Sequence, residues 1–311
     1  MSRRGVRVKT DIPSFKLENF RPQHREPVAS TAFGYNQLDT ALAIPGFEIY
    51  SSEGIRPILG PIKSAFYRIS ITIRGGVDVQ LGLEKFTQRP GTLCFTFPNQ
   101  VFCKSNVQPG TFGYYILFNP DFLDALIPSA QVQTTFPFFD YPGVPFIQLS
   151  PEEIGRVEEF VLRINDEVQR TQQGKESAVK MYLYLLLLEV KRSYERQQLH
   201  VQPPGDQHYL VSRFRRLVSQ HFLTRRKVAD YAALLAVTPN HLNRTIKTVT
   251  DTTASEAITN MLAQEAKALL RHTDASVAEV AYRLNFSDPA SFNRFFKRAS
   301  GQTPLQFREH A

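Results

Sequence analysis

The chain has 311 residues, 42% of them hydrophobic, which is enough to fill the cores of two domains. Its two cysteines, Cys94 and Cys103, lack the spacing of a disulfide framework or a zinc site. Its most apolar run, Met181–Val190, has about half the length of a membrane span, and no signal segment opens the chain. We therefore expect no metal, no cofactor, no membrane contact and a cytoplasmic location.

The net charge of +8 is unevenly distributed, because residues 205–311 hold 15 basic and 9 acidic side chains. A basic excess in one small domain is typical of binding to a polyanion, although a solvated basic face has the same composition.

The N-terminal half has a strand-like pattern. Residues 1–30 are basic and aperiodic, and we expect a flexible tail. Residues 31–149 contain short apolar runs broken by turn residues such as Gly75-Gly76, which predicts a β-barrel or a sandwich. The clearest runs are 47–50, 66–73, 93–97 and 114–118.

A pair of helices is predicted over residues 150–197. Ser150, Pro151 and Glu153 form the signature of a helix start, and a second helix is expected from about Lys175 to Gln197. The first helix has a narrow apolar seam, and the second is apolar on every side. The pair either packs on the chain's own barrel or forms a homodimer contact, which we favour because a helix apolar on all faces needs more cover than one partner helix gives. The seam residues are Ile154, Val157, Val161, Ile164 and Val168. Residues 198–208, with Pro203-Pro204-Gly205, are expected to be a linker.

Residues 209–311 contain an internal duplication. Val228–Ala232 matches Val277–Ala281 at an offset of 49, and after the turn Pro239 matches Pro289 at an offset of 50. Each copy has an alanine-rich helix, a turn and a second helix opened by a capping residue and a proline. This pattern predicts two helix-turn-helix units.

The outer faces of the two second helices carry the same polar residue types. Leu242 with Ile246, and Phe292 with Phe296, are four residues apart and are expected to face the core. Asn and Arg suit contacts with base edges in the major groove and Lys suits phosphates, although a single polar position can also be a solvated face. The candidate DNA-binding residues are Asn240, His241, Asn243, Arg244 and Lys247 in the first copy, and Ala290, Ser291, Asn293, Arg294 and Lys297 in the second.

A helix predicted from Ser255 to about Arg271 joins the two copies. Its length of roughly 25 Å could hold the recognition helices about one turn of B-DNA apart, so that one chain reads two successive major-groove segments.

The C-terminal third resembles the DNA-binding domain of AraC/XylS-type regulators. The resemblance rests on Glu265–Leu270, Ser276–Asp288, Phe292–Lys297 and Gly301–Pro304. It implies one recognition helix per unit in the major groove, with Asn240, Asn243 and Arg244 in the first and Ala290, Asn293 and Arg294 in the second. In this sequence Asn285 and Asp251 stand where the family mostly has Gly, and Met261 where relatives often have Arg. We therefore expect the second unit to be the more orthodox one.

The strand-rich part resembles, more weakly, the cupin-like barrel that many of these regulators carry, on the residues Phe47–Gly54, Pro90–Leu93 and Phe118–Leu123. The resemblance implies an effector pocket, although core packing is the favoured role of each single candidate residue. The pocket candidates are Tyr50, Phe66, Tyr67, Arg68, Phe95 and Tyr115. An anionic ligand would suit Lys63, Arg68, Arg74 and Lys104, although surface solvation is the favoured interpretation of these four.

Two enzymatic alternatives are disfavoured. A metal-dependent barrel enzyme needs several His, and residues 1–199 contain only His24, placed in the expected tail. A DNA-repair alkyl transferase needs an activated Cys, whereas Cys94 and Cys103 lie in strand-like contexts.

The sequence thus predicts a non-enzymatic α+β protein: a cupin-like barrel, a helical dimerisation pair and an all-α double helix-turn-helix domain. The expected function is a transcription regulator, more specifically an activator, that binds double-stranded promoter DNA as a homodimer, contacts RNA polymerase and responds to a small-molecule effector. The alternatives are a DNA-binding regulator or an architectural protein without an effector.

Overall fold

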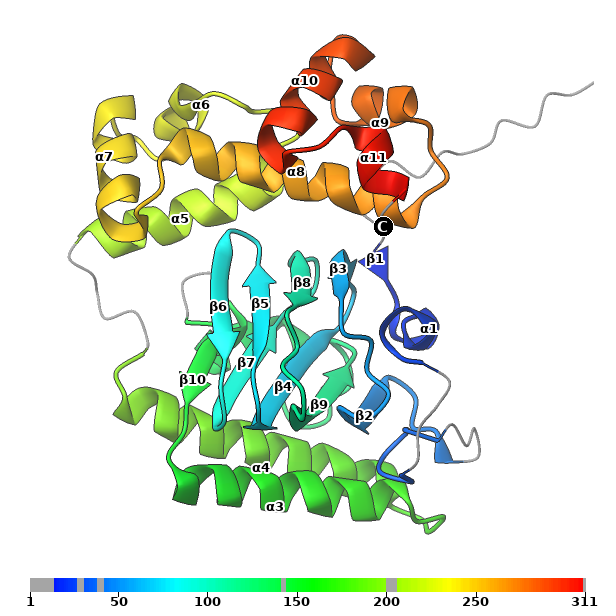
Figure 1. Cartoon of the computed structure of the whole chain (residues 1–311). Coiled ribbons are helices and arrows are strands. Elements are labelled where there is room, and N and C mark those ends of the chain that lie inside the picture. The colour runs from blue at the N-terminus through cyan, green and yellow to red at the C-terminus, as the bar shows by residue number, and fades with distance from the viewer. Residues whose placement is uncertain (1–13, 27–30, 38–41, 141–143, 200–205, 310–311) are drawn as a thin grey trace, which may run out of the picture.

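The computed structural model describes residues 14–26, 31–37, 42–140, 144–199 and 206–309. Figure 1 shows three tiers, with two long helices at the bottom, two β-sheets in the middle and a group of shorter helices at the top. The predicted α+β class, with strands in the N-terminal part and a helical C-terminal part, is confirmed.

Two five-stranded sheets form the middle tier. One has the order β1-β3-β8-β5-β6 and the other the order β10-β7-β4-β9-β2. Within the described residues they remain two separate sheets, so of the two predicted arrangements, a β-barrel or a sandwich, the structure has a sandwich-like pair of sheets. The strands are β1 (Ser14–Phe15), β2 (Phe47–Ser51), β3 (Leu59–Ser64), β4 (Tyr67–Arg74), β5 (Val77–Leu81), β6 (Glu84–Gln88), β7 (Thr92–Thr96), β8 (Phe102–Ser105), β9 (Phe112–Phe118) and β10 (Phe146–Gln148).

The segment from residue 14 to 26 is folded against the sheets, which corrects the predicted tail. Strand β1 pairs in parallel with β3, and α1 (Arg21–His24) follows it. The Phe20 side chain is fully buried and stacks on His24 at 4.4 Å between ring centroids. The buried Phe20 side chain and the pairing of β1 with β3 therefore hold a segment whose sequence shows no periodicity. Residues 1–13 and 27–30 of the predicted tail lie outside the described residues.

Helices α3 (Pro151–Val168) and α4 (Lys175–Arg196) form the bottom tier. The predicted helix start is confirmed, because Ser150 and Glu153 form a capping box. The predicted dimer seam is wrong, since its residues are buried in the core that α3 shares with α4 and the sheets of the same chain. Val157 is 1% exposed, Val161, Ile164 and Val168 are fully buried, and Ile154 is partly buried against the same core.

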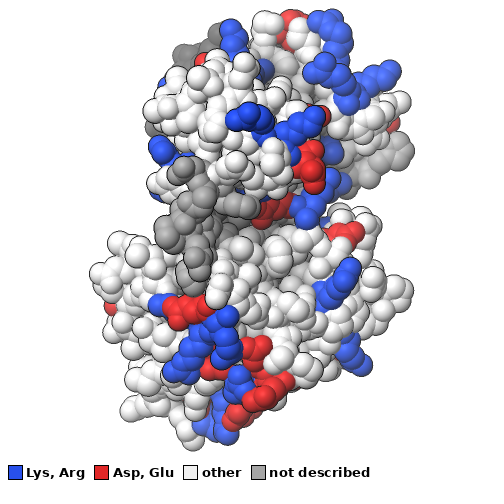
Figure 2. Space-filling view, turned by 90° about the vertical axis from the view of Figure 1, so that its left-hand side faces the viewer, with Lys and Arg blue, Asp and Glu red and all other residues white. Residues whose placement is uncertain are grey.

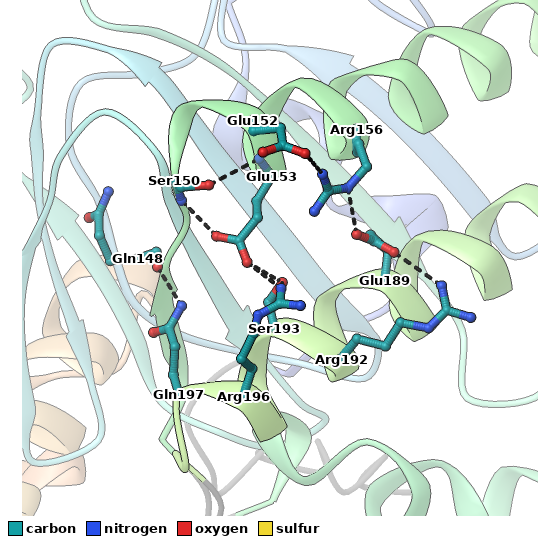
Figure 3. A network of polar contacts seen from close by, with 10 residues as sticks. All are labelled: Gln148, Ser150, Glu152, Glu153, Arg156, Glu189, Arg192, Ser193, Arg196 and Gln197. Atoms are coloured by element: carbon teal, nitrogen blue, oxygen red, sulfur yellow. Dashed lines mark hydrogen bonds and ion pairs between the residues drawn. The ribbon is translucent and has the colours of Figure 1, made fainter.

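Polar contacts join α3 to α4 at the end where the linker leaves (Figure 3). Glu153 accepts hydrogen bonds from the Ser150 backbone N–H at 2.8 Å and from the Ser193 hydroxyl at 2.7 Å, and it pairs with Arg196. Arg156 lies 2.8 Å from Glu189 across the two helices. The capping carboxylate of α3 therefore also fixes the C-terminal turn of α4.

Seven helices form the top tier, as far as the chain is described, and they share one apolar core. The predicted connecting helix is confirmed as α8, and each duplicated segment is a helix, a turn and a second helix. The helices are α5 (Asp206–His221), α6 (Val228–Leu234), α7 (Pro239–Thr250), α8 (Ala254–His272), α9 (Val277–Arg283), α10 (Pro289–Ser300) and α11 (Pro304–Glu309). No helix of the described ranges combines the length and apolarity that crossing a membrane requires.

The upper domain contacts the sheets mainly through α8 (Figure 1). Gln264 donates its amide to the Gly82 carbonyl at 2.6 Å, and Arg271 donates to the Gly60 carbonyl at 2.6 Å. Lys63 of β3 lies 3.6 Å from the buried carboxylate of Glu265. The contact is therefore a set of specific polar pairs around the ends of β3 and β5.

Candidate DNA-binding surface and cavity of the N-terminal domain

The second helix of each unit begins with a capped first turn. Thr238 accepts the His241 backbone N–H at 3.2 Å, and Asp288 accepts the Ser291 backbone N–H at 2.7 Å. Pro239 and Pro289 occupy first-turn positions, where a missing N–H costs nothing. Hydrogen bonds from the Ser291 backbone and from nearby hydroxyls lower the pKa of Asp288 to about 2, so the cap is ionised at neutral pH.

Most of the predicted DNA-binding side chains lie on the outer faces of α7 and α10. The core-facing residues are as predicted, because Leu242, Phe292 and Phe296 are fully buried and Ile246 is nearly so. The other faces leave side chains free to approach a duplex. Those exposed are Asn240, His241, Arg244, Lys247, Ala290, Asn293, Arg294 and Lys297.

Two predicted contacts have a structural partner instead. Asn243 is half-buried, and its side-chain oxygen accepts the Ala254 N–H at 3.0 Å, which fixes the start of α8 on α7. In the second unit the position equivalent to Ala254 is Pro304, which has no N–H, so Asn293 cannot make this bond. Ser291 is also half-buried, and its hydroxyl donates to Asp288 at 2.8 Å. We therefore revise Asn243 and Ser291 to positioning residues.

The two units are held together by contacts that the sequence did not reveal. Arg226 donates to the Leu284 carbonyl, and its guanidinium lies 4.5 Å from the centre of the Phe286 ring. Asn285 donates its amide to the Leu223 carbonyl at 3.1 Å. The segment before α6 is thus tied directly to the turn after α9, and the two second helices have a fixed relative position.

Both units place residues in the left-handed backbone region at equivalent corners. Ala236 has φ 56° and its counterpart Asn285 has φ 55°, while Asp251 has φ 56° and its counterpart Gly301 has φ 81°. Asn, Asp and Gly tolerate this region far better than Ala does. Asn285, which stands where the family mostly has Gly, therefore still allows the left-handed backbone that this turn requires.

The upper domain has a more basic surface than the helical layer below the sheets. On the face shown in Figure 2, Lys and Arg dominate over the upper domain, whereas basic and acidic residues are interspersed over α3 and α4. The acidic residues of α3 and α4 are mostly paired, as Glu152 is with Arg156 and Glu176 with Lys180. The excess of Lys and Arg on this face of the upper domain would favour a polyanion.

A separate cavity lies between the two sheets of the N-terminal domain. Its empty volume is about 690 Å³, including the open mouth. Its wall is largely apolar, with side chains such as Ile71, Val79 and Phe102. Of the six predicted pocket residues, Arg68 and Tyr115 belong to the wall.

The other four predicted pocket residues are core residues. Tyr67 stacks on Phe118 at 5.1 Å and Phe95 lies 4.2 Å from Phe138, both on the opposite face of the sheet from Arg68, because neighbouring residues of a strand alternate. Phe66 packs on Phe20 and Tyr50 stacks on Tyr115, and neither is part of the wall.

His24 and Lys104 are wall residues that the pocket prediction did not include. His24 lies in the segment for which the sequence predicts a flexible tail. For Lys104 the sequence predicts only a charge that would favour an anion. Its position could have been predicted, because it is two residues from Phe102 in a strand and therefore shares its face.

The two thiols have no activating environment. Burial raises the pKa of Cys94 and of Cys103 to about 12 in each case. A thiolate nucleophile would need the opposite shift.

Two helix-turn-helix units on one core, each with exposed polar and basic side chains on its second helix, define a DNA-binding domain. Residues 231–310 match the family described as helix-turn-helix domain. The C-terminal domain is an AraC-type helix-turn-helix domain, as its sequence resemblance implied.

Most of the chain is similar in sequence to a known transcription regulator. It is 22% identical over 245 residues to the HTH-type transcriptional activator RhaS of Enterobacter sp. (strain 638), covering 78% of this chain and 85% of that protein. It is 24% identical over 183 residues to RhaR of the same strain, covering 56% of this chain and only 61% of RhaR. Among solved structures, ToxT from Vibrio cholerae aligns with a TM-score of 0.41 and 11% identity, over 85% of this chain and 98% of that one.

Proposed function

We propose that this protein is a transcription regulator that binds double-stranded promoter DNA in a sequence-specific manner. The observation that carries the proposal is the pair of second helices, α7 and α10, fixed on one core with Arg and Lys side chains exposed on both. The match of residues 231–310 to a helix-turn-helix family and the similarity to two transcriptional activators support it. None of these relatives is named as an enzyme.

The geometry suggests a division of roles within the surface. Arg244 and Arg294 are at equivalent exposed positions, and arginine is suited to a bidentate contact with guanine. Asn240, His241 and Asn293 are further base-contact candidates, Ala290 offers an apolar contact, and Lys247 and Lys297 suit phosphates. Asn243 and Ser291 hold the helices that present these side chains.

Selection of bound duplexes from a random pool by the purified full-length protein tests the proposal. We expect a motif with two conserved segments about 10 base pairs apart, one for each unit. Failure to enrich any motif at moderate salt would indicate non-specific binding and would reject the proposal of a sequence-specific regulator.

Single substitutions then test the residue assignment. Arg244→Ala and Arg294→Ala should each relax base preference in one segment, at a cost of about 1–3 kcal/mol in discrimination. Arg216→Ala removes an exposed arginine of α5 and serves as the charge-matched control, which should leave the motif unchanged. If both recognition-helix variants select the original motif, the outer faces of α7 and α10 are not the reading surface.

The remaining parts of the function are predictions that belong to the same proposal. Activation of transcription, contact with RNA polymerase and a cytoplasmic site of action follow from the class of protein. A homodimer contact cannot use the buried seam of α3, and we place it on α4, where Met181 and Leu185 are 55% and 45% exposed one turn apart. An effector bound between the sheets is favoured over a regulator without one, because the N-terminal domain contains a cavity with charged groups in its wall.

A further inference from the structure

Three basic side chains from three different elements meet at the cavity between the sheets. Arg68 lies on β4 of one sheet, Lys104 lies on β8 of the other, and His24 lies on α1. All three line the cavity, and their exposed fractions are 6%, 8% and 1%. They are therefore inside the domain, where water does not screen them.

Each of the three carries a nitrogen atom without a hydrogen-bond partner. These atoms are Nε of Arg68, Nζ of Lys104 and Nε2 of His24. A buried donor left unpaired costs free energy, and an unpaired buried charge costs more. A fold keeps such groups when something else satisfies them, and their common location at one cavity points to a ligand.

No acidic side chain compensates the charge within the described part of the cavity wall. Burial and the neighbouring Arg68 and Arg25 lower the pKa of Lys104 to about 7. Burial is also the main cause that lowers the pKa of His24, with Arg68, Arg25 and Lys104 contributing in the same direction. The groups that act on the two residues are thus basic ones, and an anion would relieve their mutual repulsion.

The carboxylate of Glu48, which acts on Tyr115 of the cavity wall, is engaged elsewhere. Glu48 accepts the hydroxyl of Tyr50 at 2.9 Å, and Arg21 is the basic side chain that acts on it most strongly. Arg25 already donates to the Tyr115 hydroxyl at 2.6 Å and to the Ser51 carbonyl at 3.1 Å. The unpaired donors of Arg68 and Lys104 are therefore the ones available to a ligand.

We propose that this cavity binds a small organic carboxylate with an apolar body, whose carboxylate group is held by Arg68 and Lys104. A carboxylate group has two oxygens and one negative charge, and it therefore matches the cationic donors Arg68 and Lys104, which lie on opposite sheets. The rest of the wall is largely apolar and the cavity is larger than an inorganic anion needs, so the body of the ligand is apolar. His24 donates from Nδ1 to the Phe20 carbonyl at 2.9 Å, so its neutral ring leaves Nε2 as an acceptor and the carboxylate is held by Arg68 and Lys104 alone.

Matched pairs of probes test the inference on the purified full-length protein. Benzoate and octanoate are compared with benzamide and octanamide, which have the same shapes without the charge, by calorimetric titration and by the shift in melting temperature. Both methods suit a chain that contains no tryptophan. We expect at least one carboxylate to bind and to raise the melting temperature, with its amide at least tenfold weaker.

The variant Lys104→Met separates a ligand-binding role from a structural one. Methionine has a similar length and no charge, so without a ligand it should raise the melting temperature, because an unpaired buried amine is removed. The same variant should bind the carboxylate at least tenfold more weakly. If Lys104 had a purely structural role, Lys104→Met would lower the melting temperature instead. Lys85→Met, on the exposed side of β6, is the matched control and should change neither quantity.

Three results would overturn the inference: equal binding of carboxylate and amide, unchanged carboxylate binding by Lys104→Met and Arg68→Met, or no carboxylate-dependent shift at millimolar concentration. Tighter binding of inorganic phosphate than of either carboxylate would also reject the apolar body. The measurements use no DNA, so their failure leaves the proposed regulator untouched, and failure of the DNA selection leaves the cavity assignment untouched.

Discussion

Replacing Glu153 by glutamine will destabilise the N-terminal domain and will flatten the pH dependence of its stability. Burial alone would raise the pKa of Glu153, but hydrogen bonds from the Ser150 backbone and from Ser193, Arg196 and Ser150 side chains lower it to about 2 (Figure 3). A carboxylate with a depressed pKa stabilises the fold fully above its ordinary value of 4.5, and this contribution is lost as the pH falls towards 2.

The size of the stability loss follows from the pKa shift of Glu153 and from the solvent exposure of Glu153 and Arg196. A shift from 4.5 to about 2 corresponds to roughly 3 kcal/mol as an upper bound. The Glu153 side chain is 13% exposed but its partner Arg196 is 59% exposed, so solvent screening reduces the expected loss to about 1–2 kcal/mol at pH 7. For a domain of this size, that is a fall in melting temperature of about 2–6 °C.

Calorimetry of the full chain between pH 3 and 7 measures the effect, with Glu152→Gln as the matched control. Glu152 is the neighbouring residue of the same helix, and its pair with Arg156 is on the surface, with the Glu152 side chain 87% exposed. The control should lose less than about 0.5 kcal/mol. The reasoning is refuted if both variants lose the same amount, or if the deficit of Glu153→Gln does not shrink below about pH 4.5.

Two further predictions concern the helices. Ala236→Gly should stabilise the DNA-binding domain by about 1 kcal/mol, because Ala236 has a left-handed backbone at φ 56°, whereas Ala233→Gly, on the exposed face of helix α6, should destabilise it by about 0.5–1 kcal/mol. Urea unfolding measures the stability of both variants. If Ala236→Gly does not stabilise the domain, the backbone at Ala236 is not strained. Leu185→Arg should shift a dimer to a monomer in light scattering, and an unchanged mass would exclude the exposed pair Met181 and Leu185 as the contact.

Local signals in the sequence were sufficient to predict most helices. The capping residues Ser150 and Ser276 each have a Glu three positions later, and both helices begin where this pattern placed them. The duplication identified both units, because equivalent core positions such as Leu242 and Phe292 must be apolar for each second helix to pack. These features depend on residues within about one turn of each other, which is the range that a sequence pattern describes.

The features that the sequence missed depend on contacts between distant segments. The spacing of apolar residues in α3 indicates an apolar face but does not say what covers it. In the structure, α4 and the sheets of the same chain cover this face. The segment around Phe20 has no period, yet one buried aromatic side chain and a parallel pairing with β3 hold it. Arg226 was one of several basic residues before α6, and only the fold brings it to the Leu284 carbonyl.

Strand β3 connects the cavity to the DNA-binding domain, and this connection explains the departure at Met261. Leu59 lines the cavity, the next residue, Gly60, accepts the hydrogen bond from Arg271, and Lys63 pairs with Glu265 of α8. Because α8 rests on the sheets, Met261 faces the turn at Gly82 and is only 3% exposed. An arginine there would lose most of its hydration, whereas methionine fills the space with apolar contacts. We interpret Met261 as an adaptation of α8 to the N-terminal domain rather than as a cause of weaker DNA contact by the first unit.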